Sequence, residues 1–274
     1  MISKKIGFAG LGNIGKAMAT NIVKRGYELS VFDIRREPME ELGALGAKVV
    51  TSPKILAEVS QFIISMVRDT DQTMEVVFGE EGLWRGISPG AVLIIMSTID
   101  PQCVREIWAK GKEKGVAVID APVSGGPMGA ARGDLTIMVG GEEKVYRECL
   151  PLLEAMGKSI FYIGDTGSGL VTKLVNNLIY GIILLGTFEG LKLAGKAGVN
   201  QERLVEVLKI STGRSWAVDN WDHVLRRIQE HRENPRTSGF QLVYKDIGLA
   251  LNLAKTFEVK LPLLALAAQL EFGD

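Results

Sequence analysis

The hydrophobic pattern of the first 165 residues alternates between short apolar runs and longer stretches with helical spacing. Short runs rich in Val, Ile and Phe are typical of strands buried on both faces, and the stretches between them carry apolar residues three and four positions apart. This alternation predicts a parallel sheet covered by helices on both faces. The predicted strands are KIGFAG (5–10), LSVFD (29–33), AKVV (47–50), FIISM (62–66), AVLIIM (91–96), VAVID (116–120), LTIMVGG (135–141) and SIFYIG (159–164).

The segments between these strands are predicted to be helices. One follows the first strand and reaches Gly26, and another covers 142–157. Asp100 followed by Pro101 is typical of an N-cap and a first helical residue, because proline lacks the N–H group that a helix start leaves unpaired. We therefore predict a helix over 101–114.

The strand pattern disappears after Gly169, and only helical spacing continues to the end of the chain. The chain is therefore predicted to divide into an α/β domain over 1–165 and an all-helical domain over 166–274, with the glycine-rich GDTGSG (164–169) between them. The predicted helices of the second domain are 169–197, 201–211, 217–231, 242–257 and 262–271.

The composition excludes several classes of protein. Of the 274 residues, 32 are Lys or Arg and 32 are Asp or Glu, so the net charge is zero. That balance argues against a broad nucleic-acid surface and leaves no charge repulsion to oppose a homo-oligomer (dimer or tetramer), which we expect. The two cysteines lie outside any C-x-x-C pair, which favours a reduced, cytoplasmic setting.

No targeting, membrane or metal signal changes this picture. The first residues lead directly into a strand without a leader pattern. The longest apolar run, 178–188, is shorter than a bilayer span, so no membrane partner is expected. His223 and His231 have no Cys or carboxylate at ligand spacing, so no metal site is expected.

The segment FAGLGNIGKAM contains Gly10, Gly12 and Gly15 in the G-x-G-x-x-G spacing, directly after a strand and at the start of a helix. In that position the first glycine permits a tight turn, the second allows the backbone to approach a pyrophosphate, and the third lets helix and strand pack closely. We expect a dinucleotide on the helix N-terminus, with Asn13 and Ile14 beside it. The expected fold is an α/β Rossmann-type dinucleotide-binding domain followed by an all-helical domain.

The choice of dinucleotide depends on the residues after the second strand. Asp33 ends that strand, where a carboxylate accepts hydrogen bonds from the adenosine ribose and repels a 2′-phosphate. Arg35 and Arg36 follow, and arginines at this place pair with the phosphate of NADP. We expect NAD as the cofactor, with NADP as the open alternative.

Three further stretches place small and hydroxylated residues at strand ends: STIDP (97–101), DAPVSGGPMGAARGDLTIMVGG (120–141) and GSGLVTKLVNN (167–177). In an open parallel sheet, ligands lie at the carboxyl ends of the strands. The lysine of the third stretch, Lys173, shares a four-residue row with Gly169, Asn177 and Gly181. We expect the two glycines to leave open space around its amine; alternatively, they let another helix pack closely.

These motifs resemble the β-hydroxyacid dehydrogenase family, which includes 3-hydroxyisobutyrate dehydrogenase and tartronate semialdehyde reductase. The likeness runs from GFAGLGNIG through APVSGG and G.G...K..NN to YKDIGLAL (244–251), and covers nearly the whole chain. Two sites depart from the family pattern: Met66, Val67 and Arg68 stand where many members have Met-Leu-Pro, and Ile14 replaces a methionine. The chain also ends at LEFGD, where members usually continue with another helix.

The resemblance implies that the two domains are joined by a long helix and that substrate is held between them. It also implies roles for individual residues. Lys173 would be the catalytic acid/base with Asn177 as its partner, facing a cleft between the domains with its pKa lowered by desolvation. The substrate carboxylate would be held by the Ser-Gly-Gly segment. That segment is Ser124, Gly125 and Gly126; Thr98 and Phe240 are also expected at the substrate, and Met66, Val67, Thr98 and Lys245 at the cofactor.

The function that follows is an NAD(P)-dependent dehydrogenase of a small 3-hydroxy acid or its semialdehyde, with 3-hydroxyisobutyrate as the first expectation. Tartronate semialdehyde or succinic semialdehyde reductase is the alternative substrate class. An imine reductase of the same fold would usually lack the lysine. An alternative of another class is a dinucleotide-binding interaction module without catalysis.

Overall fold

A computed structural model describes residues 4–234 and 239–270 of the chain. The chain divides into two compact units, Met1–Lys173 and Leu174–Asp274, which meet inside the long helix α9 (Ser168–Lys196) rather than in the glycine-rich segment before it. The end of the predicted helix over 262–271 and the terminal LEFGD motif extend beyond the described residues. Each unit is described by itself below.

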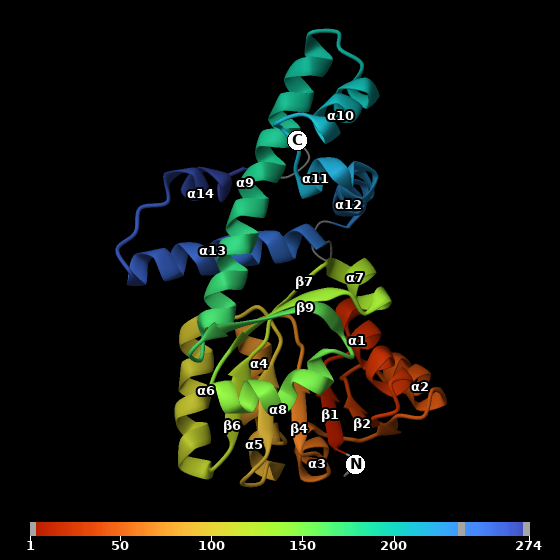
Figure 1. Cartoon of the computed structure of the whole chain (residues 1–274), viewed down its shortest axis with the longest axis vertical. Helices are drawn as coiled ribbons and strands as arrows, with labels where there is room; N and C mark the ends of the chain where they lie inside the picture. The colour runs from red at the N-terminus through yellow and green to blue at the C-terminus, as the bar shows by residue number, and fades with distance from the viewer. Residues whose placement is uncertain (1–3, 235–238, 271–274) are drawn as a thin grey trace. The chain divides into compact units, whose positions relative to one another are not determined.

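The first unit is built on one sheet whose strands run in the order β3-β2-β1-β4-β5-β6-β8-β7, with β9 beside β8 (Figure 1). The strands from β3 to β6 are parallel, and β8 runs antiparallel to β6 and β7 but parallel to β9. The parallel part has the 3-2-1-4-5-6 order of a dinucleotide-binding fold. The strands are β1 (Lys5–Ala9), β2 (Glu28–Phe32), β3 (Lys48–Val49), β4 (Phe62–Ser65), β5 (Val92–Ile95), β6 (Ala117–Asp120), β7 (Val123–Ser124), β8 (Leu135–Gly140) and β9 (Gly157–Gly164).

Helices connect these strands, as the spacing predicts. Asp100 accepts a hydrogen bond from the Gln102 N–H at 2.8 Å and caps α6, with Pro101 at the first helical position. Sequence reasoning missed the short pair β7 and α7, since the glycines around 125 and 126 carry no periodic signal. The helices are α1 (Asn13–Lys24), α2 (Arg36–Ala44), α3 (Pro53–Glu58), α4 (Thr70–Phe78), α5 (Leu83–Gly86), α6 (Pro101–Lys114), α7 (Gly126–Arg132) and α8 (Glu143–Leu153).

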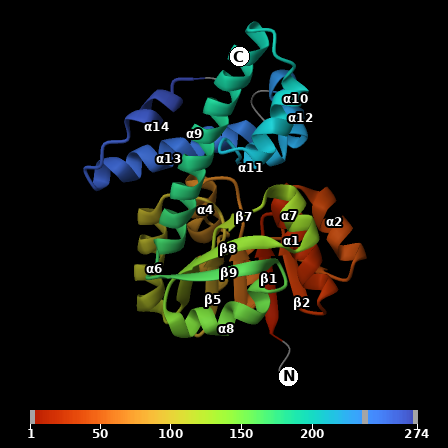
Figure 2. The same ribbon diagram turned by 45° about the horizontal axis from the view of Figure 1, so that its top comes forward.

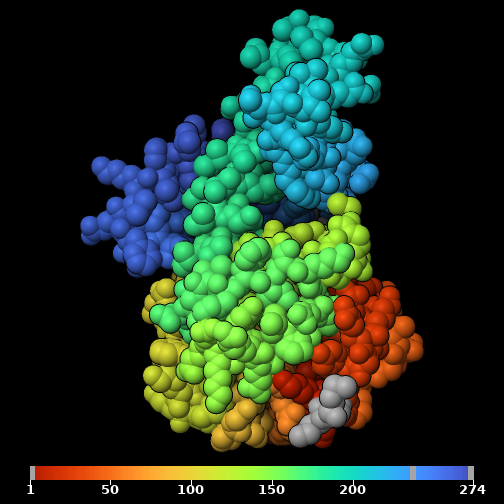
Figure 3. Space-filling view, in the orientation of Figure 1, coloured from red at the N-terminus to blue at the C-terminus, as the bar shows by residue number. Residues whose placement is uncertain are grey.

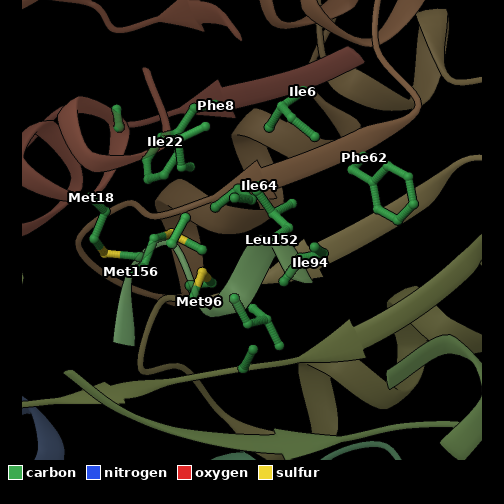
Figure 4. Packing of buried hydrophobic residues seen from close by; sticks show 14 of the residues in the cluster. Ile6, Phe8, Met18, Ile22, Phe62, Ile64, Ile94, Met96, Leu152 and Met156 are labelled. Carbon is green, nitrogen blue, oxygen red and sulfur yellow. The ribbon is translucent and has the colours of Figure 1, made fainter. Parts of the chain in front are cut away.

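The core of the first unit lies on both faces of the sheet. Successive residues of one strand belong to different apolar clusters: Ile94 packs with Ile6 and Phe8, whereas Leu93 packs with Ile63 on the opposite face. Figure 4 shows the first of these clusters, in which Met18 and Ile22 of α1 lie against the strands. Because side chains alternate along a strand, this division confirms that the continuous apolar runs form a sheet buried on both faces.

The described part of the second unit is helical. The predicted helix over 217–231 is two helices that meet at Asn220. Leu184 of α9, Val224 of α12 and Ile247 of α13 belong to one apolar core. Figure 2 shows these helices from a second direction. They are the rest of α9, α10 (Gln201–Ile210), α11 (Trp216–Asp219), α12 (Trp221–Glu233), α13 (Gly239–Thr256) and α14 (Pro262–Ala267).

Helix α9 is unusually apolar. It has 29 residues and a mean hydropathy of 1.5 over its most apolar window, of which 33% is buried. Among the described helices it alone has the length and composition of a membrane span. The central helix of a soluble protein meets the same criteria, so these properties do not by themselves indicate a membrane.

Candidate active site

The sequence-predicted residues of the first unit follow the carboxyl ends of adjacent parallel strands. Gly10 follows β1, Asp33 follows β2, Met66 follows β4, and Thr98 lies just after β5. Strand order reverses at β1, with β2 on one side and β4 on the other. In open α/β sheets a ligand lies at this edge and at this switch in strand order, so the structure brings these four residues to the place where a dinucleotide binds.

The three glycines of the loop have different surroundings. Gly10 has a φ of 97°, and a Cβ there would run into the Met66 carbonyl oxygen. A Cβ on Gly15 would run into the Gly10 carbonyl oxygen, whereas one on Gly12 would meet nothing within 4 Å. Gly12 is exposed and caps α1 without any side-chain hydrogen bond. The loop therefore has the shape that a pyrophosphate requires, with open space at the helix N-terminus.

Asp33 ties the glycine loop to β2. Its side chain is 8% exposed, and its Oδ2 accepts a hydrogen bond from the Leu11 N–H at 2.6 Å. Its Oδ1 accepts from the Arg35 N–H at 2.8 Å and from Arg35 Nε at 3.2 Å. Arg35 Nη2 also donates to the Leu11 carbonyl at 2.8 Å, so the guanidinium is folded back onto the loop.

The loop after β4 is anchored to its neighbours on both sides. The Met66 N–H donates to the Ala9 carbonyl at 2.8 Å, and the Val67 N–H donates to Ser97 Oγ at 2.8 Å. Ser97 is 1% exposed, while Thr98 next to it is half-buried. Sequence reasoning selected Thr98 and gave Ser97 no role; a buried hydroxyl directly after an apolar strand was the available signal.

The Ser-Gly-Gly segment turns sharply from β7 into α7. Ser124 is half-buried and pairs with Thr136 of β8. Gly125 has a φ of 129° and Gly126 a φ of 61°, values that side-chain-bearing residues rarely adopt. A Cβ on Gly126 would meet nothing within 4 Å. The glycines are therefore required by the backbone, and the second one leaves open space beside Ser124.

Lys173 lies near the start of α9, and its side chain is 9% exposed. The expected open space beside it is wrong on the side of Gly169, because a Cβ there would collide with the Met138 carbonyl oxygen of β8. On the other side, a Cβ on Gly181 would lie 3.4 Å from Ile247 of α13, which is an ordinary van der Waals contact. Close packing, the alternative interpretation of the sequence, therefore holds for Gly169, whereas Gly181 contacts α13 at a distance that a side chain would tolerate.

Asp120, at the end of β6, holds the first turn of α9. Its carboxylate is fully buried and accepts hydrogen bonds from the Gly167 N–H at 2.6 Å and the Leu170 N–H at 2.8 Å. Burial raises the pKa of this carboxyl to about 6, although both N–H donors and the charge of Arg105 act in the opposite direction. Sequence reasoning quoted the segment that begins at Asp120 and assigned the residue no role.

A second polar group lies in the helical unit. Asn177 Nδ2 donates to Asp246 Oδ2 at 2.5 Å, and Lys245 Nζ lies 2.8 Å from Asp246 Oδ1. Asp246 is 6% exposed, so this carboxylate links two of the sequence-predicted residues inside the second unit. Asp246 itself was missed, although it stands beside Lys245 in the quoted YKDIGLAL motif.

Phe240 is 1% exposed and belongs to the core of the second unit. The Arg227 guanidinium lies 5.0 Å from the centre of its ring, and the His231 ring lies 5.6 Å away. These contacts make it a packing residue, and its contact with substrate stays a prediction. Candidate residues therefore occur in both units, and among the described residues there is no cluster of three or more metal-binding side chains.

Two sequence models of protein families match the chain. Residues 5–164 match the NAD binding domain of 6-phosphogluconate dehydrogenase. Residues 167–271 match a model described as NAD-binding of NADP-dependent 3-hydroxyisobutyrate dehydrogenase. The two matches follow one another and cover nearly the whole chain.

Individual proteins are similar over the same length. An NAD-dependent L-serine dehydrogenase of Pseudomonas aeruginosa is 37% identical over 270 residues, which are 97% of this chain and 91% of that protein. A 3-hydroxyisobutyrate dehydrogenase of the same organism is 38% identical over 270 residues, 97% of this chain and 90% of that protein. The solved structure of Mycobacterium tuberculosis 3-hydroxyisobutyrate dehydrogenase with L-serine is 29% identical, with a TM-score of 0.82 and coverage of 98% and 92%.

Proposed function

Because the chain belongs to the β-hydroxyacid dehydrogenase family, we propose that this NAD(P)-dependent dehydrogenase interconverts a small 3-hydroxy acid and its semialdehyde. The observation that carries the proposal is Lys173, a cationic side chain buried near the start of an apolar helix. Burying an amine is unfavourable unless it is bound or used, and oxidation of a hydroxyl group requires a base.

The residues of the first unit fit a dinucleotide. We assign Gly10, Gly12 and Gly15 with Asn13 and Ile14 to the pyrophosphate, since the side of Gly12 is open and α1 lacks a side-chain cap. Met66, Val67, Thr98 and Lys245 are assigned to the nicotinamide end. Bound nicotinamide supplies the hydride transfer, and the chain supplies orientation and the movement of the proton.

We assign the proton transfer to Lys173. In its neutral form the amine accepts the proton of the substrate hydroxyl when the alcohol is oxidised, and the ammonium returns it when the semialdehyde is reduced. Asn177 is assigned the role of partner on the next turn of α9. Its bond to the buried Asp246 supports this role, because a side-chain amide held at one end presents a fixed orientation at the other.

We assign the substrate carboxylate to Ser124, Gly125 and Gly126. A serine hydroxyl and glycine N–H groups donate to a carboxylate without crowding it, and the space beside Gly126 is open. The same segment begins four residues after Asp120 in the sequence. Substrate binding and the start of α9 are therefore linked through one strand end.

The substrate is proposed to be 3-hydroxyisobutyrate or a close 3-hydroxy acid, with tartronate semialdehyde or succinic semialdehyde as the alternative. The names of the two Pseudomonas relatives support the first class, since L-serine and 3-hydroxyisobutyrate both carry a hydroxymethyl group one carbon from the carboxylate. NAD is proposed over NADP because Asp33 is buried at the ribose end and Arg35 is folded back onto the loop.

The experiment that tests the function is a turnover screen with both cofactors. The panel contains 3-hydroxyisobutyrate, L-serine, glycerate, 3-hydroxypropionate, 4-hydroxybutyrate and threonate, together with the two semialdehydes and a cyclic imine. We expect NAD-dependent oxidation of at least one 3-hydroxy acid. Cofactor binding without turnover of any compound would instead support a non-catalytic module, and turnover of cyclic imines alone would support an imine reductase.

A further inference from the structure

The end of β6 joins three parts of the first unit at one residue, Asp120. It pairs with Gly140 of β8 in antiparallel register, and two residues separate it from β7, which carries Ser124. One carboxylate oxygen accepts a hydrogen bond from the N–H of Gly167, the residue before α9, and the other accepts from the N–H of Leu170 in the first turn of α9. A single side chain thus connects the sheet, the Ser-Gly-Gly segment and the helix of Lys173.

The start of α9 packs so closely against the sheet that its position is fixed by the sheet. A Cβ on Gly169 would lie 2.9 Å from Asp120 Oδ2, and a Cβ on Gly140 would lie 2.6 Å from Asp120 Oδ1. Only glycine therefore fits at these two positions, which lie on either side of the carboxylate. The first turn of α9 therefore has little freedom to slide or rotate against β6 and β8.

Other helices in this unit are capped without such burial. Asp100 caps α6 and Asp69 caps α4, and both are half-buried. Asp120 is fully buried, and no ion pair to it occurs among the described residues. The charge of Arg105 on α6 acts on this carboxylate, but Arg105 Nε donates its hydrogen bond to the Thr166 carbonyl, at 3.4 Å. Burying a carboxylate is unfavourable, so an ordinary cap does not explain its place.

We propose that Asp120 is a positioning residue for proton transfer, which fixes the first turn of α9 so that Lys173 is held at a constant place relative to the Ser-Gly-Gly segment. Lys173 lies one turn beyond Leu170 on the same helix, so a shift of the first turn moves its side chain. This inference rests on the proposed function, since it assigns no reaction to Asp120 itself.

The test compares Asp120→Asn with the wild-type full chain. Asparagine has the same size but offers one acceptor, and its NH₂ group faces an N–H donor, so one of the two bonds to α9 is lost. We expect kcat to fall by about 10- to 100-fold, while KM and the Kd for NADH change by less than about twofold. Equal kcat in variant and wild type overturns the proposal, and so does a parallel loss of kcat, KM and NADH affinity.

The control is Ser52→Ala, which removes the N-cap bond of α3 in the same unit. Like Asp120→Asn, this variant loses one side-chain bond to a helix start, but the helix is not α9. The kcat of Ser52→Ala is therefore expected to stay within about twofold of wild type. If Asp120→Asn does not fold, Asp120→Ser is used, in which a hydroxyl keeps one acceptor. A drop in kcat with Ser52→Ala as large as that with the Asp120 variant overturns the proposal.

Two readouts do not depend on turnover. The first is the rate at which the Lys173 amine reacts with a small acylating reagent, measured by peptide mass spectrometry. This rate is expected to change in Asp120→Asn but not in Ser52→Ala. An unchanged rate in Asp120→Asn overturns the proposal. The second is amide exchange at Gly167 and Leu170 in the wild-type chain, where rapid exchange overturns it. If the wild type turns over no compound, the proposed function fails, and these readouts still decide the role of Asp120.

Discussion

At the scale of single residues, Lys173 and Asp120 are both ionisable and both buried, but they have opposite tasks. Lys173 is proposed to exchange a proton with the substrate. Asp120 is fully buried, and each of its two carboxylate oxygens accepts a backbone hydrogen bond. Lys173 is therefore assigned to proton transfer, and Asp120 to holding the start of α9 in position.

Lys173→Ala is expected to lower kcat by about 10²–10⁴-fold, the range for loss of an acid/base group. NADH binding should be retained, because most residues assigned to the cofactor lie in the glycine loop and at the strand ends. Steady-state kinetics and a fluorescence titration with NADH measure the two effects. Lys196→Ala, at the exposed end of the same helix, is the control, and near-normal turnover in Lys173→Ala would contradict the mechanism.

Asp120 also makes the unfolding free energy depend on pH. Its pKa is about 6 in the folded chain against 3.8 as the ordinary value. Between these pH values the folded chain binds a proton that the unfolded chain releases, so the stability from this group is present below pH 4 and is lost as pH rises to about 6. At 1.36 kcal/mol per pH unit, the loss is at most about 3 kcal/mol.

Urea unfolding of wild type and Asp120→Asn at pH values from 4 to 7 measures this effect. The difference in unfolding free energy between the two chains should shift in favour of the variant as pH rises through this range. Ser52→Ala, which removes a cap without an ionisable group in the same unit, should show no such shift. A pH-independent difference between wild type and Asp120→Asn would refute the assignment.

At the scale of elements, the strand–loop–helix unit β1–α1 separates the roles of two neighbouring glycines. Gly15 touches the Gly10 carbonyl, and its missing side chain is a requirement of packing. Gly12 faces open space and has a φ of −65°, so the fold itself accepts a side chain there. The pyrophosphate proposed at this helix N-terminus would account for the missing side chain.

Gly12→Ala is therefore expected to fold as well as wild type. Its free energy of unfolding should rise by up to about 1 kcal/mol, because alanine reduces the conformational freedom of the unfolded chain. Its Kd for NADH should rise by at least about tenfold, because the added methyl lies at the helix N-terminus where the pyrophosphate is assigned. Gly15→Ala should instead lower the melting temperature. Calorimetry and NADH titration distinguish the two, and unchanged NADH affinity in Gly12→Ala would refute the assigned pyrophosphate site.

At the scale of the whole molecule, the second unit has an apolar surface that the described chain does not cover. A groove of about 500 Å³ lies between α9, α10 and α11, lined mainly by apolar side chains with Gly186 and Gly190 among them. Leu193 beside it is 73% exposed, and the green residues of α9 are visible at the surface in Figure 3. We propose that a second copy of the chain covers this groove in the expected homo-oligomer.

Leu193→Asp is expected to reduce the oligomer to a smaller species, because a carboxylate placed in an apolar interface loses its hydration. Light scattering coupled to size-exclusion chromatography measures the mass. Leu45→Asp, at an exposed apolar position in the first unit, is the matched control. An unchanged mass for Leu193→Asp would exclude this groove as the interface between copies.

The local elements and the family could be predicted from the sequence because both are encoded by neighbouring residues. Apolar runs predicted the strands, Asp100 and Pro101 predicted the start of α6, and the glycine spacing predicted the β1–α1 loop. The matches to relatives confirm the family, the fold class and the enzyme class. The roles of individual residues, Lys173 included, stay predictions.

Tertiary structure alone decided how distant polar groups pair. The bonds from Asp120 to α9 join residues 47 and 50 positions apart, and Asn177 reaches Asp246 across 69 positions. It also placed Phe240 in a core and made Gly169 a position where only glycine fits. Periodicity and short motifs record only the chain near each residue, whereas the partner of a buried polar group depends on which strand end and which helix the fold brings together.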